Sequence, residues 1–355
     1  MRIGVPKEIK PREGRVALVP EACGQLVARG HEVLVQAGAG SESGFADAAY
    51  AQHGGTLAPD ATSLYQRAEL IVKVKEPWGA EPDLLEARHR LFCFLHLAAN
   101  VDLMERLRAR GLTAIAFETL MDGGRLPILV PMSDIAGRLA IQLGATLLHG
   151  YNAGKGLLLG GLSAAERGRV VVLGAGNAGG AATRMAADMG ALVTVFARRR
   201  EQLQAMRELG PNVTSLYPYP HALEQALRRA DILVGAVLVP GARAPHLVLR
   251  DQVKAMQPGS VIVDISVDQG GCIETTRPTT YENPTYVEQG VVHFAVTNMP
   301  GAVPRSASGA LCASLMPYLL RLAEDDWRAE PALAGAVNLD RGEIVHPALK
   351  SSLKS

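Results

Sequence analysis

The sequence predicts an α/β fold of two doubly wound, Rossmann-like domains with parallel sheets that face each other across a cleft. The chain has 355 residues, which corresponds to about two domains, and 48% of them are apolar, which is enough for two hydrophobic cores. Short apolar runs alternate with helical patterns, as in βαβ units around a parallel sheet. A glycine-rich turn of the dinucleotide-binding type follows one of these runs.

The first domain is expected to comprise residues 1–130 together with 306–355 and to bind the substrate. Its predicted strands are 2–5, 32–36, 70–74, 91–95 and 113–117, and its predicted helices are 20–29 and 101–110. No phosphate-binding glycine turn accompanies these segments. We therefore expect this domain not to hold a dinucleotide itself.

The second domain, residues 131–305, is expected to be the dinucleotide-binding Rossmann domain. It begins with a helical pattern over residues 133–151, for which Ser133 is the predicted N-cap, and this helix is long enough to bridge two domains. The later predicted strands are 170–173, 191–196, 231–237, 260–266 and 291–296, and the predicted helices are 201–209 and 221–229. A last helix, 306–323, is expected to return the chain to the first domain.

The glycine turn carries the strongest functional signal. The apolar run 170–173 is followed by G-x-G-x-x-G and then by a helical pattern, which is the context that a dinucleotide-binding turn requires. In such a turn the glycines permit a tight bend and close approach of a pyrophosphate to the helix N-terminus. The residues expected to bind the cofactor here are Gly174, Gly176, Asn177, Ala178 and Gly179.

The adenosine end of the predicted cofactor site lacks an expected carboxylate. Chains that bind NAD usually carry Asp or Glu about 20 residues after the glycines, where this chain has Ala197. Arg198, Arg199 and Arg200 follow directly, and arginine at this place can accommodate the 2′-phosphate of NADP. Either NAD or NADP is therefore expected as cofactor. The alternative interpretation of the arginines is that they only begin a solvated helix and bind no phosphate.

Composition favours small molecules as partners. The 36 basic and 35 acidic residues give a net charge of +1, and no charge block indicates nucleic acid or a membrane surface. Cys23, Cys93, Cys272 and Cys312 form no C-x-x-C pair, so neither a disulfide framework nor a metal site is predicted. No signal core or membrane-spanning apolar run is present, and we expect a cytoplasmic protein.

Several polar residues follow predicted strands, where ligands bind in open parallel sheets. Lys75, His96, Asp268 and Asn298 each follow a predicted strand, and Arg15 lies in the loop after the first strand. Taken singly, each has an ordinary structural role: a surface ion pair, a buried histidine or a turn cap. As a set, the cations suit a substrate carboxylate, and histidine and aspartate suit proton transfer.

Seven motifs in order give the chain a resemblance to the alanine dehydrogenases, whose relatives include the NAD-binding subunit of proton-translocating transhydrogenase. They occupy residues 2–8 with 15–18, 72–77, 95–99, 131–133, 235–238, 268–272 and 298–305. The resemblance implies a homohexamer, carboxylate binding by Arg15 and Lys75, and proton transfer by His96 and Asp268. It implies further cofactor contacts at Ser133, Asn177, Ala178, Val237, Leu238, Ile265, Val267, Asp268, Arg277, Asn298 and Met299.

The implied activity is reversible oxidative deamination of L-alanine to pyruvate and ammonia, with hydride transfer to a nicotinamide cofactor. The chain departs from the family at the adenosine end, where Ala197, Gln202 and Pro218 replace the usual residues. This departure leaves open an NADPH-dependent dehydrogenase or imine reductase acting on another 2-amino or 2-oxo acid. A non-catalytic, transhydrogenase-like dinucleotide-binding subunit is the remaining alternative.

Overall fold

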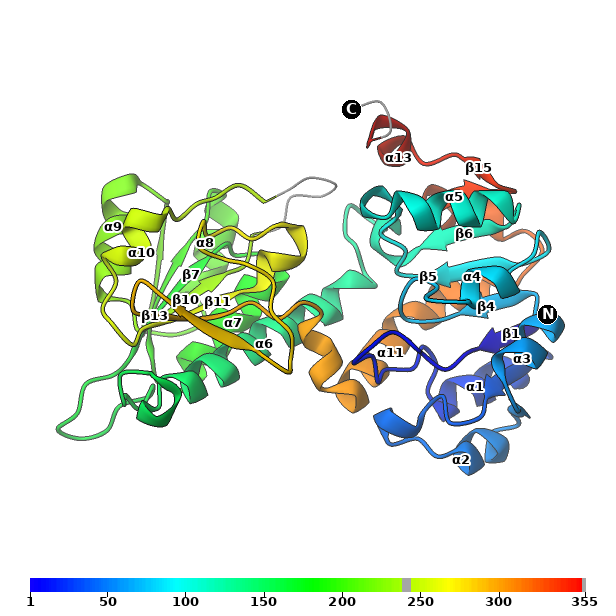
Figure 1. Cartoon of the computed structure of the whole chain (residues 1–355), viewed down its shortest axis with the longest axis horizontal. Coiled ribbons are helices and arrows are strands. Elements are labelled where there is room, and N and C mark those ends of the chain that lie inside the picture. Colours follow the sequence, from blue (N-terminus) through cyan, green and yellow to red (C-terminus); the bar gives the residue numbers. More distant parts are fainter. Residues whose placement is uncertain (238–243, 353–355) are drawn as a thin grey trace. The chain divides into compact units, whose positions relative to one another are not determined.

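The computed structural model describes residues 1–237 and 244–352. The chain divides into two compact units: unit 1 comprises Met1–Met132 and Gly301–Ser355, and unit 2 comprises Ser133–Pro300. Each unit is built around one sheet flanked by helices (Figure 1). The chain passes from unit 1 to unit 2 within the long helix α6 (Leu129–Leu147).

The sheet of unit 1 contains eight strands among the described residues. Its order is β15 (Glu343–Ile344), β14 (Val337–Asp340), β6 (Thr113–Ala116), β5 (Arg90–Cys93), β4 (Leu70–Val72), β1 (Arg2–Val5), β2 (Glu32–Gln36) and β3 (Thr56–Ala58). The pairs from β6 to β3 are parallel, whereas β14 pairs antiparallel with both β6 and β15. The order reverses between β1 and β4, which is where doubly wound sheets bind ligands.

The helices of unit 1 pack on this sheet around a core that includes the buried side chains Leu34, Ile71 and Leu91. They are α1 (Pro20–Val27), α2 (Asp47–Gln52), α3 (Ala61–Arg67), α4 (Glu81–Leu84), α5 (Val101–Ala109), α11 (Pro304–Leu322), α12 (Pro331–Gly335) and α13 (Pro347–Ser352). Four of these helices begin with proline at the first position, where the missing N–H costs no hydrogen bond.

The sheet of unit 2 contains seven strands among the described residues and has the same plan. Its order is β12 (Thr285–Glu288), β13 (Val291–Phe294), β11 (Val261–Asp264), β10 (Ile232–Gly235), β7 (Arg169–Leu173), β8 (Leu192–Phe196) and β9 (Val213–Leu216). All neighbours are parallel except β12, which pairs antiparallel with β13 at the edge. The order reverses between β7 and β10, so the glycine turn after β7 lies at the ligand-binding position.

The remaining helices of unit 2 are α7 (Asn177–Asp188), α8 (Arg200–Arg207), α9 (Pro220–Arg229) and α10 (Arg250–Lys254). The strands β7, β10 and β11 consist almost wholly of buried β-branched and leucine side chains, as expected for strands covered on both faces. The two α/β units with parallel-dominated sheets confirm the predicted fold class.

The predicted start of the long helix was wrong. The helix begins at Leu129, so Ser133 lies within it and is not its N-cap. Serine is a common N-cap, but here the helix already includes Pro131, which the first turn tolerates because no intrahelical N–H bond is required there. The helix ends at Leu147, and a separate 3₁₀ turn covers Gly150–Asn152.

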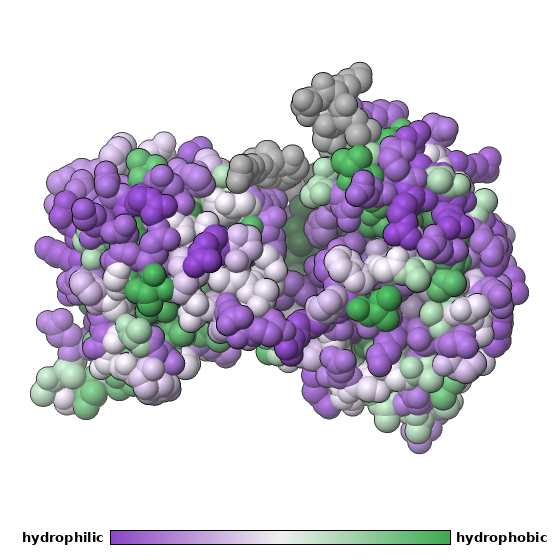
Figure 2. All heavy atoms as spheres, in the orientation of Figure 1, coloured by the Kyte–Doolittle hydropathy of each residue, from purple (hydrophilic) through white to green (hydrophobic). Residues whose placement is uncertain are grey.

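The surface has the mixed character of a globular protein. Hydrophilic residues predominate on the face shown in Figure 2, and hydrophobic residues form small, separate groups there. In residues 1–237 and 244–352, no helix is both long and apolar enough to span a bilayer.

Candidate active site

The glycine turn of unit 2 is shaped for close approach by a ligand. Gly174 has φ +95°, and a Cβ on it would lie 2.4 Å from the carbonyl oxygen of Ala236. A Cβ on Gly179 would lie 1.9 Å from the carbonyl oxygen of Gly174, so only glycine lets the helix pack on this turn. Gly176 differs, because a Cβ on it would meet no atom within 4 Å. The open space at Gly176 is where a pyrophosphate could approach the backbone.

The helix that follows presents free amide groups to this space. Helix α7 begins at Asn177, and its N-cap residue Gly176 has no side chain to satisfy the first N–H groups. Helix α6 packs tightly beside it, because a Cβ on Gly137 would lie 2.1 Å from the carbonyl oxygen of Ala178. The uncapped amides and the helix dipole suit a dinucleotide pyrophosphate, so the residues present fit this cofactor.

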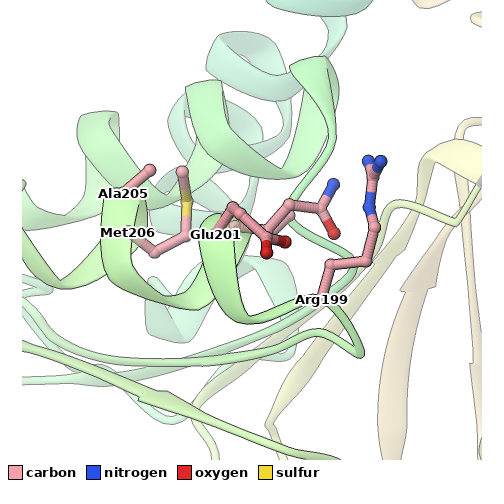
Figure 3. A pocket seen from close by; sticks show the side chains of 6 residues that line it. Arg199, Glu201, Ala205 and Met206 are labelled. Atoms are coloured by element: carbon pink, nitrogen blue, oxygen red, sulfur yellow. The ribbon is translucent and has the colours of Figure 1, made fainter.

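A pocket lies where the adenosine end of a dinucleotide is expected. It is lined by Ala175, Arg199, Glu201, Gln202, Ala205 and Met206 (Figure 3). Ala197 is buried at the end of β8, whereas Arg198, Arg199 and Arg200 are exposed. Of these three arginines, Arg199 is among the lining residues, and it shares the pocket with the carboxylate of Glu201.

The loops after β10 and β11 are tied together. The hydroxyl of Ser266 donates to the carbonyl oxygen of Val237 at 2.9 Å and accepts from the Val237 N–H at 2.9 Å. The 3₁₀ turn Ile265–Gln269 buries Val267 and leaves the Asp268 side chain exposed. Val237, Ile265, Val267 and Asp268 thus share one region at the carboxyl ends of adjacent strands, while Leu238 lies outside the described residues.

Of the other predicted cofactor residues of unit 2, Ser133 lies in α6, and the remaining three follow β11 and β13. The Arg277 guanidinium lies 4.1 Å from the centre of the Tyr286 ring, and the Arg277 N–H donates to the Tyr286 hydroxyl. Asn298 has φ +58°, in the left-handed region that asparagine tolerates. Met299 is buried, and its carbonyl oxygen accepts from the hydroxyl of Tyr281.

Lys75 and Arg15 lie close together in unit 1, near the point where the strand order reverses. Lys75 follows β4 and Arg15 belongs to the loop after β1, which are neighbouring strands. Burial and the charge of Arg15 lower the pKa of Lys75. Within the described part of the chain, the Lys75 ammonium donates no hydrogen bond and forms no ion pair. Two neighbouring cations, one of them without a carboxylate partner, form a site that attracts an anion.

Arg15 is held by a buried carboxylate. Its Nε and Nη2 atoms donate to the two oxygens of Glu13 at 2.6 and 2.5 Å, and its Nη1 lies 3.1 Å from the sulfur of Met132. The Arg15 side chain is 2% exposed and that of Glu13 is fully buried. This paired, planar contact fixes the orientation of the guanidinium.

The backbone at Lys75 is held by a buried triad of Lys73, Glu8 and Glu81. The Lys73 ammonium donates to Glu8 at 3.2 Å and to Glu81 at 2.9 Å. Although burial works in the opposite direction, these two carboxylates raise the pKa of Lys73, so its ammonium stays charged. The other Glu8 oxygen accepts the Val74 N–H at 2.6 Å and the Lys75 N–H at 3.4 Å. The triad therefore orders the segment that presents Lys75.

His96 follows β5 at the same edge of the sheet. Its backbone has φ +48°, a left-handed conformation that is uncommon for residues other than glycine. The carboxylate of Glu118 accepts the backbone N–H groups of Leu95 and His96, and lies 3.9 Å from the His96 Nδ1 atom. The imidazole stacks on Phe94 with 5.8 Å between ring centres and remains half exposed. These contacts present the ring to solvent at the carboxyl edge.

Comparisons with known proteins identify the family of the chain. The family described as alanine dehydrogenase/PNT matches with its N-terminal domain over residues 4–136 and with its C-terminal domain over residues 140–347. The chain belongs to the alanine dehydrogenase/PNT family. It is 45% identical to an alanine dehydrogenase of Halomonas elongata over 98% of this chain and 96% of that protein.

Two solved structures place the chain within the alanine dehydrogenase/PNT family. One, an L-alanine dehydrogenase, matches with a TM-score of 0.96 and 47% identity, covering 100% of this chain and 99% of the other. A transhydrogenase from Sinorhizobium meliloti matches with a TM-score of 0.85 and 26% identity, covering 98% and 100%. Membership identifies the protein as an oxidoreductase that uses a nicotinamide cofactor.

Sequence reasoning missed the carboxylates that hold the candidate residues of this family member. Glu8 supports Lys75, Glu13 supports Arg15, and Glu118 supports His96. A lysine between two buried valines, at position 73, was the one available signal of such a network, since a buried ammonium requires an anionic partner. Among the residues that the structure describes, no cluster of three His, Cys, Asp or Glu side chains could hold a metal ion.

Proposed function

We propose that the protein is an alanine dehydrogenase that interconverts L-alanine and water with pyruvate and ammonia. One observation supports this most directly: the unpaired ammonium of Lys75 lies beside Arg15 at the strand-order reversal of unit 1. A family match over nearly the whole chain supports the same reaction. The proposal includes the homohexamer that the sequence resemblance implies, and assigns substrate binding to unit 1 and dinucleotide binding to unit 2.

Arg15 and Lys75 bind the substrate carboxylate. Both side chains are cationic; Glu13 restrains the Arg15 guanidinium, and Glu8 restrains the backbone of Lys75. Fixing the carboxylate orients the α-carbon and so lowers the entropic part of the activation free energy. A bound nicotinamide would accept the α-hydrogen together with the electron pair of its bond, as a hydride.

His96 and Asp268 handle the protons. As the α-hydrogen leaves, the amine nitrogen becomes an iminium, water adds to its carbon, and ammonia departs to give pyruvate. Water must lose a proton when it adds, and an imidazole can accept one near neutral pH. An Asp268 carboxylate stabilises the positively charged nitrogen. In the reverse direction the same groups return the protons.

Turnover with pyruvate and ammonia tests the proposed reaction. We expect purified protein to oxidise reduced nicotinamide cofactor only when both pyruvate and ammonia are present, measured by the loss of nicotinamide absorbance. Omitting ammonia is the matched control. Cofactor binding by calorimetry without turnover on any small 2-oxo acid would instead favour a dinucleotide-binding subunit. Faster turnover with a different 2-oxo acid would reassign the substrate.

We propose further that the cofactor site tolerates or prefers NADP. A carboxylate at position 197 would bind the ribose hydroxyls and repel a 2′-phosphate, and Ala197 does neither. Arg199 lines the pocket at this end and can pair with the phosphate, while Glu201 in the same pocket opposes it. The arginine contact is worth about 10- to 150-fold in preference when the guanidinium is ordered.

The ratio of kcat/KM for NADPH over NADH tests this preference. We expect Arg199→Ala and Ala197→Asp to lower the ratio, and Ala197→Asp also to raise kcat/KM for NADH. We expect Glu201→Gln to raise the ratio, because it removes the repulsion between the Glu201 carboxylate and the 2′-phosphate. Arg229→Ala, at the end of α9, is the control because it removes an exposed arginine away from the pocket. A native enzyme that strongly prefers NADH, with a ratio that none of these changes moves, would mean that the arginines only face solvent.

A further inference from the structure

The carboxylate of Asp264 is buried beside the cofactor loops, and the proposed mechanism does not use it. Asp264 ends β11 and is fully buried. Its two oxygens accept the Ser266 N–H at 3.0 Å and the Cys272 N–H at 2.9 Å. The two donors stand at opposite ends of the loop that carries Asp268. One side chain therefore closes this loop at both ends.

The backbone is packed closely around this carboxylate. A Cβ on Gly235, at the end of β10, would lie 2.6 Å from Oδ1 of Asp264. A Cβ on Gly271, which has φ +79°, would lie 3.0 Å from Oδ2. A side chain on either glycine would press on the carboxylate, so the backbone confines Asp264 from both sides. Burial raises the pKa of Asp264, and the hydrogen bonds that its carboxylate accepts from backbone N–H groups act in the opposite direction.

The loop held by Asp264 is linked to the next strand. Ser266, one of the two N–H donors, exchanges two hydrogen bonds with Val237 after β10. Between the clamped ends, the turn closes through bonds from Gly270 N–H to Val267 and from Gly271 N–H to Ser266. The exposed Asp268 side chain thus projects from a segment whose ends cannot move independently.

We propose that Asp264 is a positioning residue that sets the place of the Asp268 carboxylate by fixing both ends of the loop 265–272. The inference rests on the proposed role of Asp268 in proton transfer. It assigns Asp264 no contact with the substrate and no proton of its own. Its effect on the reaction passes through the loop, because a shift of about 1 Å in a reacting group can lower the rate by up to about 100-fold.

The substitution Asp264→Asn tests the proposal, because it keeps the size of the side chain but replaces one acceptor by a donor. One of the two loop ends then faces an N–H group without an acceptor. We expect kcat for pyruvate reduction to fall by about 10- to 100-fold. The dissociation constant of the reduced cofactor should stay within about threefold, since the glycine turn is unchanged.

The variants Asp268→Asn and Asp264→Asn/Asp268→Asn separate the two proposals. If Asp264 acts through Asp268, the double variant is no slower than Asp268→Asn alone. An unchanged kcat in Asp264→Asn together with an impaired Asp268→Asn would overturn the inference and leave the proposed function intact. Native activity in Asp268→Asn would instead remove the proposed role of Asp268, and the inference with it.

A matched control distinguishes positioning from stability. Asp231 lies at the opposite end of the same sheet, just before β10, and accepts from Lys155 and the Arg169 N–H. Asp231→Asn should lower the unfolding temperature without changing kcat. If Asp264→Asn does not fold, Gly271→Ala displaces the same loop end by its contact with Asp264 and should show the same loss of kcat. Native kcat in a folded Gly271→Ala would contradict the proposal.

Discussion

Replacement of His96 by asparagine is expected to lower kcat by about 10²- to 10⁴-fold, the usual contribution of a general acid–base group. Asparagine suits this test because His96 has φ +48°, and asparagine adopts the left-handed conformation readily. The variant therefore keeps the backbone and the bonds of Leu95 and His96 to Glu118, and removes only the imidazole. Steady-state kinetics with pyruvate and ammonia measure the effect.

The control for His96 is His53→Ala, since His53 is an exposed histidine at the end of α2 in the same unit. This variant should keep native kcat. Calorimetric binding of the reduced cofactor should be unchanged in both variants, and the unfolding temperature of His96→Asn should match that of the native protein. A kcat within about threefold of native in a folded His96→Asn protein would return His96 to an ordinary surface role.

Replacement of Lys75 by alanine is expected to lower kcat/KM for pyruvate by about 10- to 150-fold and to raise KM. A charge-assisted contact to a carboxylate is worth about 1.5–3 kcal/mol, and this one exists in both the ground state and the transition state. Lys350→Ala, which removes an exposed lysine of α13, should leave kcat/KM unchanged. Equal KM values for native protein and Lys75→Ala would exclude a contact between Lys75 and the substrate.

The pH dependence of KM gives a second readout of the same residue. Burial and the charge of Arg15 lower the pKa of Lys75, so its proton is lost at a lower pH than that of an ordinary lysine. The cationic form is present below this pKa, and KM for pyruvate should therefore rise as pH increases through it. Lys75→Arg stays charged throughout and should show no such rise. An alkaline rise that persists in Lys75→Arg would have to come from another group.

The interior strands of both sheets could be predicted because the hydrophobic pattern of a strand can be recognised from its own residues. The predicted strands 2–5 and 32–36 match β1 and β2, which are buried along most of their length. The edge strand β12 escaped prediction because its residues alternate between exposed and half-buried positions and include no strong apolar run. Strand β14 escaped because its apolar and polar residues alternate over only Val337–Asp340, which is too short a pattern to stand out.

The candidate site likewise contains residues that could be predicted from the sequence and supporting residues that could not. Lys75 and His96 could be predicted because a polar residue directly after an apolar run marks the end of a parallel strand. Their supporting groups could not be, because Glu8 lies 67 residues from Lys75 and Glu118 lies 22 residues from His96. Only the paired strands bring these carboxylates to the sites that they hold.

The pairing of β14 with β6 also determines when unit 1 can be completed during synthesis. Strand β6 ends at Ala116, but its antiparallel neighbour β14 begins at Val337, after the whole of unit 2. Unit 2 is one uninterrupted segment, so it can close its sheet while β6 still has an open edge. A ribosome that stops before codon 337 therefore releases a chain with unpaired N–H and C=O groups along β6, which is an edge that other unfinished chains can join.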